Sequence, residues 1–198
     1  MNFLIVSGLS GSGKTIALQA LEDAGFYCID NLPAALLPHL AEHMHAAGEE
    51  RVAAGVDARN REFFAGATRA LEHVQALGVQ YRILFLEADE SILVKRYQET
   101  RRRHPLVDDH TSLTEAIRLE RSLLEPLSVA SALRIDTTRT TPHALRHRVN
   151  DYVRGTQTAG VTLQFESFGY KRGTPLDADF VFDVRCLPNP YWQPELRN

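Results

Sequence analysis

The chain has 198 residues, which is enough for one domain or for one domain and part of another. Hydrophobic residues make up 44% of the chain and charged residues 24%, so the composition predicts a packed core and excludes an intrinsically disordered protein. The formal net charge of −3 excludes a generally basic nucleic-acid-binding protein, although a local basic patch is compatible with it.

Short apolar runs alternate with amphipathic segments over residues 1–154. Strands are predicted at residues 3–6, 26–29, 52–56, 81–88 and 133–136. Helices with their caps are predicted at residues 15–24, 33–47, 60–77, 89–103, 112–130 and 141–154. The fourth helix has Asp89 as its cap, the fifth opens with a Ser112–Glu115 capping box, and the sixth opens with Thr141 and Pro142. Buried strands alternating with helices predict a parallel sheet covered on both faces, which is a three-layer α/β/α fold.

The pattern changes at residue 155. Residues 155–160 (GTQTAG) are interpreted as a linker, and residues 161–198 combine two strand-like stretches with proline-rich turns. Because two strands and a loop cannot enclose a core, these last residues are expected to be a short β-rich appendage or the start of a second domain. No secretory signal or membrane-spanning run is visible, and the two cysteines fit no disulfide or metal framework, so we expect a cytoplasmic protein with no membrane partner.

The stretch GLSGSGKT matches the phosphate-binding pattern G-x-x-x-x-G-K-[ST] at every fixed position, between a predicted strand and a predicted helix. Glycines let the backbone approach a ligand closely, and the amide hydrogens of the loop and of the helix start then form an anion cradle. Lys14 is expected to reach the β- and γ-phosphates, and the Thr15 hydroxyl to hold Mg²⁺ bound with ATP or GTP. The predicted nucleotide-binding residues of this loop are Gly8, Leu9, Ser10, Gly11, Ser12, Gly13, Lys14 and Thr15. The alternative is a Gly- and Ser-rich turn that binds nothing.

Two acidic residues follow predicted strands and are candidates to organise the metal ion. Asp57 is the better magnesium-side candidate, and Asp30 is expected to face a phosphoryl acceptor or an attacking water. The alternative for each is an aspartate that ends a strand and caps the next loop.

The stretch KRYQETRRRH is strongly basic. Arg96 and Arg101 are the favoured pair for closing over the phosphates and neutralising developing charge, together with Lys14 and Asp30 as catalytic candidates. Residues 104–112 (HPLVDDHTS) are expected to form a mobile lid tip. Two alternatives stay open, namely a solvated helix face and contacts with RNA phosphates by Arg101–Arg103.

Five motifs together resemble the RapZ/YvcJ family of bacterial nucleotide-binding proteins. They are GLSGSGKT at Gly8–Thr15, DNLP at Asp30–Pro33, DARN at Asp57–Asn60, RYQETRRRHPL at Arg96–Leu106 and FDVRCLPNPYW at Phe182–Trp192. The resemblance covers essentially the whole chain in matching order, and the last motif is the most specific to the family.

The resemblance implies a kinase-like P-loop NTPase domain over residues 1–154 that binds ATP and GTP and hydrolyses them slowly. It assigns a GTP-associated segment to Asp57, Ala58, Arg59 and Asn60. Enterobacterial members are tetrameric RNase adapters, which bind small RNAs that control glucosamine-6-phosphate synthase and present them to an endoribonuclease. A small RNA, an endoribonuclease and further copies of this chain are therefore among the expected partners.

Family members also carry a carboxy-terminal domain that senses the amino sugar phosphate and ends in a basic, RNA-binding tail. Six residues follow Trp192 here, so most of that domain is expected to be missing from this chain. Three functions stay open at this point: a regulatory adapter with weak ATPase and GTPase activity, a small-molecule kinase, and an RNA-binding module with a vestigial P-loop.

Overall fold

The structure is a computed structural model, and it describes residues 1–57, 66–154, 167–174, 180–183 and 186–187. The chain divides into two compact units, residues 1–159 and residues 160–198. Each unit is described by itself.

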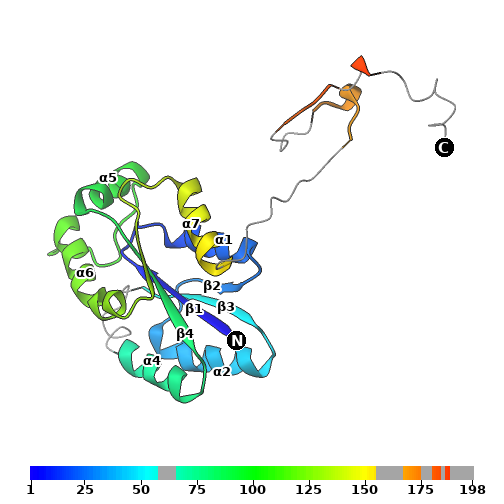
Figure 1. Ribbon diagram of the computed structural model, residues 1–198. Helices are drawn as coiled ribbons and strands as arrows, with labels where there is room; N and C mark the ends of the chain where they lie inside the picture. The colour runs from blue at the N-terminus through cyan, green and yellow to red at the C-terminus, as the bar shows by residue number, and fades with distance from the viewer. Residues whose placement is uncertain (58–65, 155–166, 175–179, 184–185, 188–198) are drawn as a thin grey trace. The chain divides into compact units, whose positions relative to one another are not determined.

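The first unit is built on a five-stranded parallel sheet with the order β2-β3-β1-β4-β5 (Figure 1). The strands are β1 (Asn2–Gly8), β2 (Tyr27–Ile29), β3 (Arg51–Gly55), β4 (Tyr81–Glu87) and β5 (Leu133–Asp136). The first strand is central, and its Val6 pairs with Gly55 of β3 on one side and with Leu84 of β4 on the other. Because the strands are parallel, their carboxyl ends share one edge of the sheet, where ligands bind in open α/β folds.

Helices cover both faces of the sheet (Figure 1). They are α1 (Lys14–Asp23), α2 (Leu37–Ala46), α4 (Ala67–Ala76), α5 (Glu90–Thr100), α6 (Leu113–Val129) and α7 (Pro142–Arg154). Leu4 and Val6 pack into the core that α1 and α7 share, whereas Phe3 and Ile5 pack into the core shared with the other four helices. This alternation follows from the two-residue period of a strand and confirms the predicted three-layer α/β/α fold.

Most predicted elements lie where the sequence places them, with corrections in the helices. The helix predicted to run through Arg103 ends at Thr100, because Arg101 takes a left-handed conformation with φ of 52°. The helix predicted from residue 33 begins with a 3-10 turn, Ala34–Leu36, before α2. The helix predicted from residue 60 is not continuous either, because Gly66 is the N-cap of α4, which begins at Ala67; residues 60–65 lie outside the described residues.

The predicted helix caps differ in how they are realised. The capping box of α6 is complete, since the Ser112 hydroxyl accepts from the Glu115 amide and the Glu115 carboxylate accepts from the Ser112 amide. Asp89 stands at the capping position of α5, but its side chain makes no capping hydrogen bond. Its backbone amide instead donates to the hydroxyl of Thr138, 2.9 Å away.

The second unit has few described residues. They include a 3-10 turn, Tyr170–Arg172, and two exposed aromatic rings, Phe180 and Phe182, whose centroids stack 6.4 Å apart. The predicted linker and most of the two predicted strands lie outside the described residues. In the part of the chain that is described, no helix has the length and apolarity needed to cross a bilayer.

Gly8→Ala should lower the free energy of unfolding of the first unit much more than a glycine-to-alanine change in an open turn. A Cβ at Gly8 would lie 2.1 Å from the Leu86 carbonyl oxygen, and φ there is +144°. We expect a loss of at least about 3 kcal/mol in the free energy of unfolding, measured in urea by circular dichroism. Gly48→Ala is the control, because φ of +76° is strained but nothing lies within 4 Å, and it should cost about 1–2 kcal/mol. Equal losses would contradict this packing account.

Candidate phosphate-binding site

The loop that joins β1 to α1, residues 8–15, passes directly beside the backbone of β4. The Leu9 amide donates to the Leu86 carbonyl oxygen at 3.0 Å, which continues the β1–β4 pairing by one residue. Gly11 and Gly13 then take φ values of 85° and 107°, which L side chains rarely adopt. The chain therefore turns through a tight loop that only this glycine pattern permits.

The helix that follows presents its amino-terminal end to the loop. Gly13 is the residue before α1 and supplies no side-chain cap, so the first amide hydrogens of the helix have no acceptor within it. These amides and the helix dipole favour an anion at this position. The Lys14 ammonium lies across the loop, 2.6 Å from the carbonyl oxygen of Gly8 and 3.3 Å from that of Leu9.

Two serine hydroxyls at the loop are buried without a partner. Within the described residues, the Ser12 hydroxyl oxygen has no hydrogen-bond partner, and neither has that of Ser7 near the end of β1. Unpaired buried hydroxyls are costly, so a ligand that accepts or donates a hydrogen bond there would relieve them. The Thr15 side chain is exposed at the start of α1 and is available to a metal ion.

The two predicted acidic residues lie at the same edge of the sheet as the loop. Asp57 is half-buried two residues beyond β3, the strand that pairs with β1. Asp30 follows β2 and accepts from the amide of Asn31 at 2.7 Å. Its carboxylate lies over the end of β3, since a Cβ on Gly55 would be 2.8 Å from Asp30 Oδ1. In the described residues no group of three or more His, Cys, Asp and Glu is placed to hold a metal ion. A Mg²⁺ ion bound beside a nucleotide commonly takes one or two protein ligands and completes its shell with phosphate oxygens and water.

Of the remaining predicted site residues, Arg96 contacts the loop and Arg101 is exposed beyond α5. Arg96 on α5 donates to the Gly11 carbonyl oxygen at 2.9 Å and to the Thr137 carbonyl oxygen at 2.7 Å, so it joins the loop to the segment after β5. Arg101 is exposed just beyond α5. Ala58, Arg59 and Asn60 lie outside the described residues.

Part of the predicted lid tip is anchored in the first unit. His104 is 2% exposed and Leu106 is 8% exposed, whereas the preceding Arg101–Arg103 are exposed. The His104 and Leu106 side chains are therefore held in the core on either side of the exposed Pro105, and mobility is no longer expected for this part of residues 104–112.

Glu120 is a site residue that the sequence patterns did not single out. Its carboxylate is 1% exposed and accepts from the Ser10 amide at 2.8 Å and from the Ser10 hydroxyl at 2.6 Å. It also contacts the Nε2 atom of His104 at 3.2 Å. A signal was available in the sequence, because Glu120 occupies an apolar position of α6, in line with the buried Ile117 and Leu124.

Burial raises the pKa of Glu120, but the other contacts outweigh this effect and hold it below its usual value. The lowering comes from the hydrogen bond with His104, from the positive charge of Lys14 and from the two bonds donated by Ser10. The carboxylate is therefore ionised at neutral pH.

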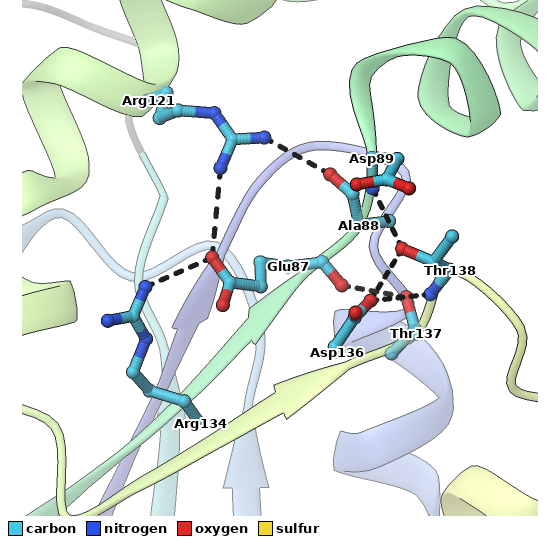
Figure 2. A network of polar contacts seen from close by, with 8 residues as sticks. All are labelled: Glu87, Ala88, Asp89, Arg121, Arg134, Asp136, Thr137 and Thr138. Carbon is cyan, nitrogen blue, oxygen red and sulfur yellow. Dashed lines mark hydrogen bonds and ion pairs between the residues drawn. The ribbon is translucent and has the colours of Figure 1, made fainter.

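A second polar network lies at the carboxyl ends of β4 and β5 (Figure 2). Glu87 contacts Arg134 at 3.1 Å and Arg121 at 3.7 Å, while Arg121 also donates to the Ala88 carbonyl oxygen. Thr137, in the same network, lies near the Glu87 backbone. Its hydroxyl also donates to the Ser12 carbonyl oxygen at 2.9 Å. The network thus reaches the loop of residues 8–15 from the β5 side.

Two family models match the chain. The model described as the RapZ-like N-terminal domain matches residues 1–157, and the one described as the RapZ C-terminal domain matches residues 161–198. The chain belongs to the RapZ-like family. The family resemblance drawn from the five motifs is therefore confirmed.

Curated relatives support this assignment. A "Nucleotide-binding protein" of Nitrosococcus oceani is 52% identical over 203 residues, which span all of this chain and 70% of the relative. A "Nucleotide-binding protein" of Methylobacillus flagellatus is 54% identical over 200 residues and is covered to 69%. The chain thus spans about 70% of the length of these relatives.

The shikimate kinase of Acinetobacter baumannii in complex with shikimate is similar in fold. The TM-score is 0.51 at 14% sequence identity, and the match covers 77% of this chain and 90% of the kinase. This likeness concerns the fold alone, which is that of P-loop kinases.

The depressed pKa of Glu120 predicts a pH dependence of stability. A carboxylate whose folded pKa lies below its unfolded value stabilises the fold above the unfolded value, near pH 4.5, and loses this contribution as the pH falls through the folded pKa. Wild type should therefore lose more unfolding free energy between about pH 6 and pH 3 than Glu120→Gln, whose amide does not titrate. Urea unfolding at each pH measures this. Parallel pH profiles for the two proteins would show that Glu120 is not stabilised as a carboxylate.

Proposed function

We propose that this chain binds ATP and GTP, with Mg²⁺, in the loop of residues 8–15. The observation that carries the proposal is the turn of three positive-φ glycines that leads into an uncapped helix start, together with a half-buried aspartate, Asp57, just beyond the neighbouring strand β3. Such a turn is built to receive phosphate oxygens. The names of the curated relatives, which are nucleotide-binding proteins, point the same way.

The residues have separate tasks in this proposal. The Leu9, Ser10 and Ser12 amides already donate to Leu86, Glu120 and Leu9, so the phosphates would be received by the amides of Gly11, of Gly13 and of the first turn of α1. Lys14 turns from the carbonyl oxygens of Gly8 and Leu9 toward them. Thr15 and Asp57 would hold Mg²⁺, which neutralises phosphate charge when it is bound. A phosphate cradle does not read the base, so both ATP and GTP fit it.

We further propose that hydrolysis is slow and that the chain acts as a regulatory adapter. Fast hydrolysis needs a group that orients water and an arginine free to reach the γ-phosphate. Here Asp30 accepts a hydrogen bond from the amide of its own neighbour, Asn31. Arg96 would have to leave Gly11 and Thr137 to reach a phosphate. A site arranged in this way favours binding over turnover.

The exposed Arg101–Arg103 supply a surface for an RNA partner of the adapter. Each arginine–phosphate contact that is lost should lower the slope of log affinity against log salt by about 0.7 on single-stranded RNA, so loss of all three contacts should lower it by about 2. Replacing all three arginines with alanine and titrating a small RNA at several salt concentrations measures this. An RNA module with a vestigial P-loop would bind RNA but neither ATP nor GTP.

A small-molecule kinase is the second candidate, and the placement of Asp30 favours it. Its carboxylate lies at the end of β3, on the edge of the sheet that also carries the P-loop and Asp57. A carboxylate there could receive a proton from an acceptor hydroxyl. Release of ADP that depends on an added metabolite, well above the rate with water, would favour the kinase over the adapter.

Lys14→Ala should weaken the binding of ATP and GTP by about tenfold to a hundredfold, because it removes a charged contact with the phosphates. Isothermal titration at equal Mg²⁺ measures the change. Lys95→Ala is the matched control, since the Lys95 ammonium is exposed on α5 and pairs only with the exposed Glu99 at 3.8 Å among the ion pairs of the described chain. If both variants bound like wild type, the P-loop assignment would be wrong.

Asp57→Asn should distinguish the contribution of the metal ion to ATP affinity from that of the phosphate contacts. The amide keeps the shape of the side chain but loses the charge that attracts a divalent cation. Affinity for ATP should therefore fall in the presence of Mg²⁺ and change little in EDTA. Equal losses in both conditions would mean that Asp57 acts on the nucleotide site without a metal ion.

A further inference from the structure

Ser10, His104 and Glu120 form a buried cluster, called the clasp here. Ser10 belongs to the P-loop, His104 follows the three exposed arginines, and Glu120 comes from the middle of α6. All three residues are less than 10% exposed, and the side chains of His104 and Glu120 are 0% and 1% exposed. The clasp therefore joins three segments that lie far apart in the sequence.

The hydrogen bonds of His104 define its protonation. The Leu106 amide donates to Nδ1 at 3.1 Å, so Nδ1 must carry a lone pair. The proton then resides on Nε2, which donates to the Glu120 carboxylate at 3.2 Å. A neutral imidazole and one carboxylate thus account for every bond of the clasp, and the carboxylate accepts three hydrogen bonds in all.

The clasp is connected through Tyr97 to the residues that contact Gly11. The His104 ring packs against Tyr97 with centroids 5.2 Å apart, and Tyr97 lies 3.5 Å from the position a Cβ would take on Gly11. Arg96, next to Tyr97, donates to the Gly11 carbonyl oxygen. The first half of the P-loop is therefore held on one side by α5, by residues 104–106 and by α6.

An apolar side chain would be the cheaper choice at this position of α6. A buried carboxylate costs free energy unless its partners compensate, and neighbouring positions on the same face carry Ile117 and Leu124. The role of the Glu120 carboxylate therefore lies in the three hydrogen bonds that it accepts. Its oxygens fix one P-loop residue and the histidine that follows the arginines.

We propose that Glu120 is a positioning residue of the nucleotide site. Through the clasp it fixes Ser10 in the arrangement that lets the rest of the P-loop receive phosphates, and through His104 it anchors the carboxy-terminal end of the Arg101–Arg103 segment. This inference rests on the proposed nucleotide binding and adds the group that sets the shape of the site. Removing the acceptor oxygens should loosen the loop and the arginines together.

Two variants at one position separate the acceptor oxygens from the charge. Glu120→Met keeps an unbranched side chain of similar length and removes every oxygen acceptor. Glu120→Gln can keep all three contacts, with its oxygen accepting from the Ser10 amide and from His104, and its NH₂ donating to the Ser10 hydroxyl. Glu90→Met is the matched control, because Glu90 also joins α5 to α6, through an exposed pair with Arg118, and touches no P-loop residue.

Binding of ATP and of AMP to each variant is the first readout, at a temperature where circular dichroism shows the variant folded. Glu120→Met should bind ATP about tenfold more weakly, whereas Glu120→Gln should stay within about threefold of wild type. AMP has no β- or γ-phosphate, so its affinity should change much less. A merely structural role would change stability without changing the ratio of ATP to AMP affinity.

Trypsin cleavage at Arg101–Arg103 without nucleotide is the second readout. Cleavage, identified by mass spectrometry, should be faster in Glu120→Met than in wild type, Glu120→Gln and Glu90→Met. If folded Glu120→Met kept the wild-type ATP to AMP ratio and cleavage rate, the inference would be wrong. If wild type bound neither ATP nor GTP, the proposed function would fail first, whatever the trypsin result.

Ser10→Ala serves if Glu120→Met does not fold. This variant removes the Ser10 hydroxyl and its hydrogen bond to Glu120, whereas the hydrogen bond from the backbone amide of residue 10 to Glu120 remains. A fall in ATP affinity of about threefold or more, with AMP affinity kept, supports the clasp. Unchanged ATP affinity overturns it.

Discussion

The candidate site depends on how closely the chain passes β4 as it leaves β1. At Gly8 there is no space for a side chain, because a Cβ would lie 2.1 Å from the Leu86 carbonyl oxygen. One residue later the Leu9 amide bonds to that same oxygen. This contact fixes where the loop starts, and the positive φ values of Gly11 and Gly13 then determine where α1 begins. A phosphate cradle requires that both the start of the loop and the start of α1 are fixed, because its amides must converge on one point.

The orientation of the carbonyl oxygens of the loop, like that of its amides, affects whether the loop can bind an anion. An anion would be repelled by carbonyl oxygens turned toward it, and here three of them are held by donors of the protein. Arg96 donates to Gly11, Thr137 donates to Ser12, and Lys14 lies against Gly8. The Arg96 and Thr137 contacts can persist when a ligand binds and so preorganise the loop, whereas Lys14 would move from Gly8 to the phosphates. Glu120 adds the complementary contact, a carboxylate that occupies the amide and hydroxyl of Ser10.

The sequence predicts the layers and the loop well because both depend on local patterns. The alternation of apolar runs and helical periods is enough for a parallel sheet, and GLSGSGKT between strand and helix is enough for a P-loop. The supports of the loop are not local. Thr137 follows β5 among several other threonines, and nothing in its surroundings distinguishes the one whose hydroxyl meets Ser12. The end of α5 depends on one left-handed residue, Arg101, which helical propensity alone does not predict.

The most direct test of the account is to map ATP onto the backbone amides by ¹⁵N nuclear magnetic resonance, with Mg²⁺ present. The account predicts that the largest shifts fall on the amides of Gly11, Ser12, Gly13, Lys14 and Thr15, and that they saturate together. Smaller shifts should follow at Ser10 and His104, because the clasp connects them to the loop. Saturable shifts confined to other surfaces, with these five amides unmoved, would show that this loop is not where the chain binds nucleotide.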